Sequence, residues 1–90
     1  MVENFGSYLK HERELRGVSL EEISGVTNIP LRFLKSLEEN SFDELPGEVF
    51  IKGYIRSYAN IIGSDFEEML NIYKEFLEFK NPGNIPPSKP

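Results

Sequence analysis

The 90-residue chain is long enough for one small domain with a modest hydrophobic core. Its 15 acidic and 10 basic residues give a formal net charge of −5, which disfavours nucleic acid as the main ligand, since phosphate binding needs an excess of Lys and Arg. It contains no cysteine, which excludes disulfides and cysteine-ligated zinc.

The first two predicted helices are marked by their ends. A helix over residues 4–16 is followed by Gly17, a residue type that commonly ends helices in the left-handed conformation. A short second helix opens at Ser19, because Ser19 and Glu22 have the spacing of a capping box, in which each side chain satisfies a free backbone N–H. Asn28, in the turn that follows, adopts the left-handed conformation at low cost.

Two prolines mark the next two helices. Pro30 suits the first position of a third helix, where its missing N–H is not needed. Residues 40–45 then form a loop, and a fourth, longer helix covers about 46–62 and ends at Gly63. The second and third helices, joined by a tight turn, form a helix-turn-helix.

A fifth helix is expected over about 65–79, because Ser64 and Glu67 repeat the capping-box spacing. The tail, residues 81–90, has four prolines and reads as a mobile linker. No signal peptide is evident, and no stretch approaches the roughly 18 apolar residues of a membrane helix, so we expect a soluble chain. We therefore predict an all-α fold, a five-helix helix-turn-helix domain over residues 1–80.

The stretch VSLEEISGVTNIPLRFLKSLEEN resembles the Cro/repressor-like helix-turn-helix family along its whole length. Asn28 stands where that family usually has Gly. Arg13 and Glu38 fall where many of its members place a partly buried ion pair between the first and third helices. The resemblance thus implies a structural ion pair between Arg13 and Glu38.

A second resemblance covers roughly residues 5–70. The segments FGSYLKHERELRGVSLEEIS, IPLRFLKSLEE and FDELPGEVFIKGYIRSYANIIG are similar to the cytoplasmic domain of the RodZ family of bacterial cell-shape proteins. This resemblance implies an adaptor that binds the actin-like filament protein MreB and links it to the membrane and the wall-building machinery. It also implies a transmembrane helix beyond this chain, which holds the domain on the cytoplasmic side of the inner membrane.

The third helix presents few groups suited to reading DNA. Its expected solvent-facing residues, with one aromatic at the margin, are Leu31, Arg32, Lys35, Ser36 and Phe33. Only Arg32 and Lys35 suit DNA, and Glu38 and Glu39 cancel their charge. Leu20 replaces a Gln that often lies near the phosphate backbone in Cro-like proteins. A solvated face, a DNA contact and a protein contact all remain open, and a sequence-specific DNA-binding regulator is the alternative function.

The fourth helix carries an aromatic stripe and an aliphatic stripe. At 100° per residue, the aromatic stripe contains Phe50, Tyr54 and Tyr58, and the aliphatic stripe contains Ile51, Ile55 and Ile62. Periodicity alone favours burial of both stripes. The RodZ resemblance implies that the three aromatic residues bind MreB, and cations beside aromatics are typical of interfaces, which adds Lys52 and Arg56. We therefore expect the aromatic stripe to be at least partly exposed and the aliphatic stripe to be buried.

The sequence gives no indication of catalysis, a metal site or a cofactor. His11 is the single histidine, with no second His or Cys to complete a zinc site. The adjacent acids Glu21 and Glu22 lie at a helix N-terminus, where negative charge is stabilising. We expect neither an enzyme nor a cofactor-binding protein.

Overall fold

The computed structural model describes residues 4–80, and these residues form five α-helices and one short 3-10 helix. In chain order the elements are α1 (Phe5–Leu15), α2 (Leu20–Thr27), α3 (Leu31–Glu38), η1 (Phe42–Glu44), α4 (Glu48–Ile62) and α5 (Phe66–Lys80). The predicted all-α, five-helix architecture is confirmed. The C-terminal tail, residues 81–90, and the prediction of its mobility lie outside the described residues.

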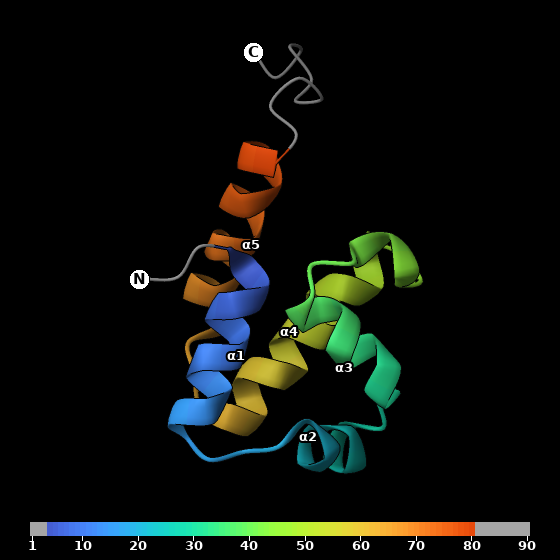
Figure 1. Cartoon of the computed structure of the whole chain (residues 1–90), viewed down its shortest axis with the longest axis vertical. Helices are drawn as coiled ribbons and strands as arrows, with labels where there is room; N and C mark the ends of the chain where they lie inside the picture. Colours follow the sequence, from blue (N-terminus) through green and yellow to red (C-terminus); the bar gives the residue numbers. More distant parts are fainter. Residues whose placement is uncertain (1–3, 81–90) are drawn as a thin grey trace.

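The helices surround one core, to which every helix contributes. Figure 1 shows α1 and α5 running alongside each other, with α2 and α3 on the other side of α4. Helix α4 packs against α5 and α2, and α1 packs against α3 and α5. The largest fully buried side chains are Phe5, Leu9, Ile23, Leu34, Leu37, Ile55, Tyr58, Met69 and Tyr73. Among residues 4–80, no helix combines the length and apolarity needed to cross a bilayer.

Local capping chemistry fixes the helix-turn-helix as the sequence predicts. The Glu22 amide donates to Ser19 Oγ at 3.0 Å and the Ser19 amide donates to Glu22 Oε1 at 2.9 Å, which completes the predicted capping box. Asn28 ends α2 in the left-handed conformation, at φ 65°. Helix α3 begins at Leu31, one residue later than predicted, so that Pro30 precedes its first turn.

The start of α5 differs from its prediction. The helix begins at Phe66, and Asp65 Oδ1 accepts a hydrogen bond from the Glu67 amide at 3.0 Å. The hydroxyl of Ser64 instead donates to Glu12 Oε1 on α1, at 3.3 Å. Asp65 therefore takes the capping role expected of Ser64, because the helix starts one residue later than the 65–79 prediction.

The segment 40–45, predicted as a loop, contains η1 and contributes to the core. Phe42 packs edge-on against Tyr73 of α5, with ring centroids 5.3 Å apart. η1 also covers α3: Ser36 Oγ donates to Glu44 Oε1 at 3.3 Å, and Ser36 is only 5% exposed. The expected solvent exposure of Ser36 was therefore wrong, because the chain after α3 folds back over it.

A polar contact joins the start of α1 to the end of α3. The Gly6 amide donates to Asn40 Oδ1 at 2.8 Å, and Asn40 Nδ2 donates to Asn4 Oδ1 at 2.9 Å. The approach is so close that a Cβ atom on Gly6 would overlap the backbone carbonyl of Glu38. Glycine is required at this position because two backbones come into contact there. The conformational freedom of glycine is not needed.

Candidate functional site

The predicted ion pair between Arg13 and Glu38 is present and mostly buried. Arg13 Nε lies 2.7 Å from Glu38 Oε2, and Arg13 Nη2 donates to Glu38 Oε1 at 3.1 Å, which makes the pair bidentate. The two side chains are 12% and 8% exposed. The remaining guanidinium nitrogen donates to the Val18 carbonyl at 3.0 Å. Hydrogen bonding to the Glu38 carboxylate raises the pKa of Arg13 above its usual value.

Tyr58, predicted to contact a partner, belongs to the core. Its side chain has no solvent exposure, and its hydroxyl donates to the Glu38 carboxylate and also lies 3.0 Å from the Leu9 carbonyl. Burial, followed by the hydrogen bond to Glu38, raises the pKa of Tyr58 well above its usual value. The prediction was wrong because each i to i+4 step advances about 40° around a helix, so a stripe that begins outside at Phe50 reaches the core two steps later.

Phe50 and Tyr54 remain accessible, and α3 adds a third ring. Phe50 is 56% exposed, whereas Tyr54 is half-buried. Tyr54 packs on Phe33 of α3, with ring centroids 5.9 Å apart and planes tilted by 31°. The Arg32 guanidinium carbon lies 4.8 Å from the centroid of the Phe33 ring. We call Phe33, Phe50 and Tyr54 the aromatic patch. The expected burial of Ile51, Ile55 and Ile62 is confirmed.

Basic residues dominate the charge on the exposed side of α4. Lys52 and Arg56 are exposed, as expected of rim residues, and the segment from Val49 to Asn60 contains no Asp or Glu. Glu48, exposed in the first turn of α4, is the one acid on this helix, so on a chain with a net charge of −5 the exposed side of α4 carries two cations against one anion. At 100° per residue, Lys52 and Arg56 lie at least about 120° around the helix from Phe50 and Tyr54. Such a surface suits a partner with an apolar pocket and an acidic rim.

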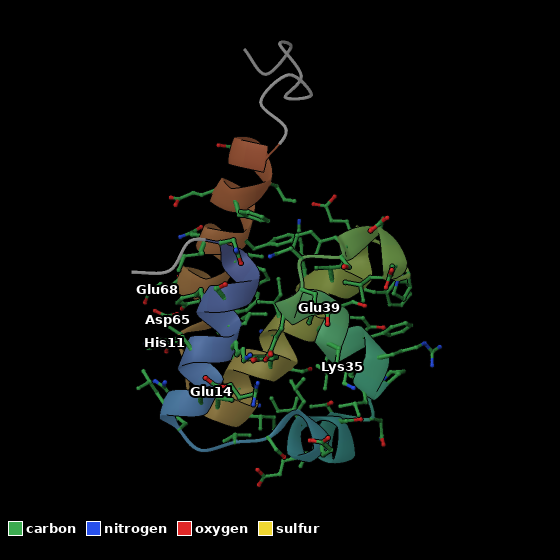
Figure 2. The ribbon with its side chains drawn as sticks, in the orientation of Figure 1. His11, Glu14, Lys35, Glu39, Asp65 and Glu68 are labelled. Atoms are coloured by element: carbon green, nitrogen blue, oxygen red, sulfur yellow. The ribbon has the colours of Figure 1, made fainter. Side chains whose placement is uncertain are left out.

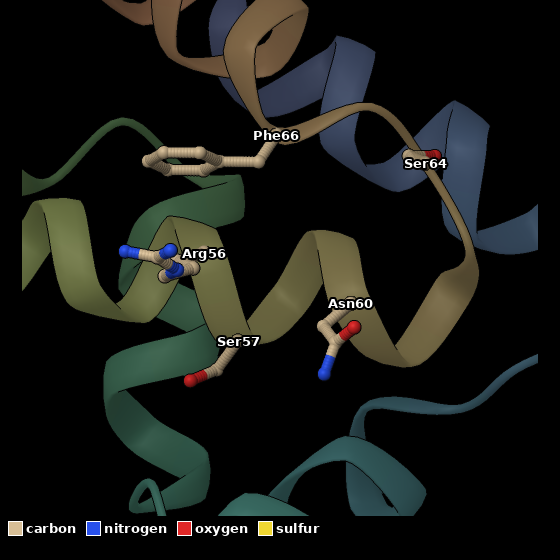
Figure 3. Close-up of a pocket in the computed structure, with 5 residues that line it drawn as sticks. All are labelled: Arg56, Ser57, Asn60, Ser64 and Phe66. Atoms are coloured by element: carbon tan, nitrogen blue, oxygen red, sulfur yellow. The ribbon is translucent and has the colours of Figure 1, made fainter.

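A shallow cleft lies on the α5 side of α4. It encloses about 360 Å³ and is lined by Arg56, Ser57, Asn60, Ser64 and Phe66. Figure 3 shows the Arg56 side chain beneath the Phe66 ring, with Ser57 and Asn60 along the opposite edge of α4. The sequence reasoning placed Arg56 at the rim of an interface but missed Phe66, because the contact joins residues on two helices.

The helix-turn-helix face is poorly suited to phosphate. Arg32 and Lys35 are exposed, as expected, but Glu21 and Glu22 are exposed on the first turn of α2. Figure 2 shows Lys35 and Glu39 on the same side of the molecule, at and just beyond α3. From α2 to Glu39, the exposed residues of the helix-turn-helix segment thus include three acids and two bases, which counts against a strong phosphate contact.

His11 is exposed on α1 and labelled in Figure 2. Within the part of the chain that the structure describes, no three or more His, Asp or Glu side chains are arranged to hold a metal ion.

Comparisons with known proteins agree with this architecture. The sequence model of a helix-turn-helix domain family matches residues 8–69. The chain is 31% identical over 58 residues to the uncharacterized membrane protein YmfM of Bacillus subtilis (strain 168), and 31% identical over 68 residues to the cytoskeleton protein RodZ of Streptococcus pneumoniae (strain ATCC BAA-255 / R6). These matches cover 64% and 76% of this chain, which spans only 20% and 25% of the two relatives.

A solved structure of YmfM from Staphylococcus aureus, provisionally designated a DNA-binding membrane protein, superposes with a TM-score of 0.73. It is 30% identical in sequence, and the match covers 81% of this chain and 89% of that one. The similarity to RodZ and the arrangement of helices expected from the sequence are thus both confirmed. Since the family model spans more than half of the residues, the chain belongs to this helix-turn-helix domain family.

Proposed function

We propose that this domain is a protein-binding adaptor of the RodZ type, which binds the actin-like filament protein MreB through the exposed side of α4. In a full-length protein it would couple the filament to the inner membrane, from the cytoplasmic side, and to cell-wall synthesis, and so maintain rod shape. The observation that carries this proposal is the aromatic patch with its largely exposed Phe50 ring, on a helix that also carries the exposed cations Lys52 and Arg56.

Phe50 gives the patch a large exposed apolar ring. At 56% exposure, much of its surface remains in water, which is unfavourable unless a partner covers it. Aromatic and Arg side chains are enriched among the residues that contribute most to protein interfaces. Because Ile51 and Ile55 fix the other side of α4 in the core, the point on the helix from which this ring projects is set before any partner binds.

Tyr54 is held in place by its neighbours on α3. Its ring packs on Phe33, and the Arg32 guanidinium lies over the Phe33 ring. A side chain already confined in the free protein loses less conformational entropy on binding than a freely rotating one. The contact with Phe33 therefore supports Tyr54 as a preorganised binding residue.

The relatives support the proposed cellular setting. One is described as a cytoskeleton protein and another as a membrane protein, and each is at least four times longer than the segment matched here. A tether would have to come from outside residues 4–80, since no helix there is suited to crossing a bilayer. The domain would then serve as the filament-binding part of a longer membrane protein.

The proposal is tested by measuring binding of the domain to MreB from the same source organism, by calorimetry and by co-sedimentation with filaments. Phe50→Ala and Tyr54→Ala should each weaken binding at least about thirtyfold, the equivalent of roughly 2 kcal/mol. Val26→Ala, which alters an exposed apolar residue on α2, is the matched control and should bind normally. Circular dichroism checks that each variant is folded. Unchanged affinity in both folded α4 variants, or no binding by the wild type, would reject the proposal.

Sequence-specific DNA binding is a second candidate function, favoured by the provisional designation of the solved YmfM structure. The helix-turn-helix geometry is compatible with it. The exposed acids Glu21, Glu22 and Glu39 of the helix-turn-helix segment count against it. Its test is among the predictions below.

A further inference from the structure

The cleft between α4 and the start of α5 is separate from the aromatic patch and is lined by different residues. Of its five lining residues, one is cationic, three are neutral and polar, and one is aromatic: Arg56, Ser57, Asn60, Ser64 and Phe66. No acid lines it. Arg56 and Asn60, which line the cleft (Figure 3), are exposed, so a group on another protein has access to it.

Arg56 is held in position but has no ionic partner. Its guanidinium carbon lies 5.3 Å from the centroid of the Phe66 ring, within the range of a cation–π contact. Among residues 4–80, no carboxylate lies within ion-pair distance of Arg56. A guanidinium that stacks on a ring keeps its N–H groups free at its edge, where they match the two oxygens of a carboxylate.

Two further donors line the cleft from the same helix. Asn60 is four residues after Arg56 and three after Ser57, so it adjoins both on the helix surface, whereas Arg56 and Ser57 point about 100° apart. In the described part of the chain, the side chains of Ser57 and Asn60 make no hydrogen bond. The Ser64 hydroxyl, by contrast, already donates to Glu12. The free donors in the cleft thus belong to Arg56, Ser57 and Asn60.

We propose that this cleft binds an Asp or Glu side chain of the protein that covers the aromatic patch, with Arg56 stacked on Phe66 as the carboxylate-binding group. The inference rests on the proposed function for the identity of that protein. Phe50 and Arg56 are six residues apart, a rise of about 9 Å along α4 and a rotation of about 120° around it. One partner surface can therefore fill both sites if it covers the exposed side of α4 that lies between them.

A phosphate group fits the cleft less well than a single carboxylate. The first turn of α5 carries Glu67 and Glu68, and Asp65 already accepts a hydrogen bond from its backbone. These acids repel a dianion more strongly than a monoanion, and the cleft offers only one cation to compensate. A carboxylate with one negative charge matches the single guanidinium.

The direct test uses the 90-residue chain and a small probe. Acetyl-glutamate amide is titrated while backbone amide signals are followed by NMR, and acetyl-glutamine amide serves as the uncharged control. We expect saturable shifts at residues 56, 57, 60, 64 and 66 with the glutamate probe only. Arg56→Met should abolish them, and Arg56→Lys, which keeps the charge but loses the planar fork, should weaken them. Equal responses to both probes, shifts that persist in Arg56→Met, or tighter Arg56-dependent binding of inorganic phosphate would each overturn the proposal.

The second test uses MreB and separates this inference from the proposed function. Arg56→Met should weaken MreB binding about tenfold and make the affinity less dependent on salt, as expected when a charged hydrogen bond is lost. Normal MreB binding by Arg56→Met, together with the loss caused by Phe50→Ala, would reject the carboxylate site and leave the adaptor function standing. If wild-type MreB binding is absent, the adaptor function fails, and the probe titration still decides whether the cleft binds a carboxylate.

Discussion

The hydroxyl of Tyr58 on α4 donates a hydrogen bond to the Glu38 carboxylate on α3, while the same carboxylate binds Arg13 on α1. Helices α1, α3 and α4 are thus joined at one buried polar group. The same hydroxyl lies 3.0 Å from the Leu9 carbonyl, so α1 contacts this group through both Arg13 and Leu9. No buried side-chain nitrogen or oxygen among the described residues lacks a hydrogen-bond partner, which is the condition under which such a network stabilises a core.

Removal of the central carboxylate should strongly destabilise the domain. Glu38→Ala leaves the Arg13 guanidinium without its partner in a mostly buried site, at a cost of about 3 to 5 kcal/mol in the free energy of unfolding. Urea denaturation followed by circular dichroism measures the change. Glu39→Ala, which alters the neighbouring exposed acid, is the control and should stay within about 0.5 kcal/mol of the wild type. A similarly small effect of Glu38→Ala would show that the network contributes little.

The contact between α1 and α3 should not tolerate even one added methyl group. Gly6→Ala places a Cβ atom against the Glu38 carbonyl, so the helices must move apart, at a cost of about 1 to 3 kcal/mol or more. Gly25→Ala makes the same chemical change in α2, where a Cβ meets nothing within 4 Å, and should stabilise the domain by roughly 0.5 to 1 kcal/mol. Thermal melts of the two variants should therefore shift in opposite directions. Equal shifts would contradict the close approach.

Alkaline pH should destabilise the domain through its buried tyrosines. Burial raises the pKa of Tyr73 to about 12 and also raises the pKa values of Tyr8 and Tyr58. Because these phenols ionise more readily in the unfolded chain, their contribution is fully present below pH 10 or so and is lost as the pH rises further. For Tyr58 the loss is about 1.4 kcal/mol per pH unit above this point.

Urea midpoints measured between pH 8 and pH 11.5 test this dependence, with tyrosinate absorbance recorded in parallel. The Tyr58→Phe variant, which has no phenol at this position, should be less stable at pH 8 but should lose stability less steeply above pH 10. A wild-type midpoint that stays constant to pH 11.5 would show that these phenols are accessible to solvent in the folded protein.

DNA binding by this domain should be weak and independent of sequence. Any association with duplex DNA at low salt should disappear near physiological ionic strength, because the exposed residues of the helix-turn-helix segment include three acids and only two bases. Fluorescence anisotropy with a randomised duplex library at two salt concentrations measures this directly. The Arg32→Ala and Lys35→Ala variants should remain folded and show no loss of a specific site. Submicromolar, sequence-dependent binding at physiological salt would favour the DNA-binding regulator instead.

Features governed by neighbouring residues were predictable from the sequence. The capping box of Ser19 and Glu22, the left-handed Asn28 and the burial of Ile51, Ile55 and Ile62 depend on spacings within one or two turns, and the structure confirms each of them. The ion pair between Arg13 and Glu38 spans a longer distance, and it was the family resemblance that indicated it.

Features that depend on how helices meet were missed. Tyr58 shares a stripe with Phe50 in sequence, but the rotation of the stripe relative to α3 and α1 decides which ring is buried, and periodicity does not give that angle. Ser36 is covered by a segment that carries no helical pattern. The contacts of Phe33 with Tyr54 and of Phe66 with Arg56 join separate helices, so neither pair could be found by reading a single helix.

Tyr54 and Tyr58 lie one turn apart on α4, the first at the surface and the second in the core. Any ligand that requires Tyr54 in its present position therefore binds only the folded domain, because the packing of Tyr58 sets the orientation of the helix. Binding and folding are then thermodynamically linked: a partner at a hundred times its dissociation constant adds about 2.7 kcal/mol to the stability of the domain. A small domain anchored in this way would resist proteolysis while it is bound to its partner and become vulnerable when it is released.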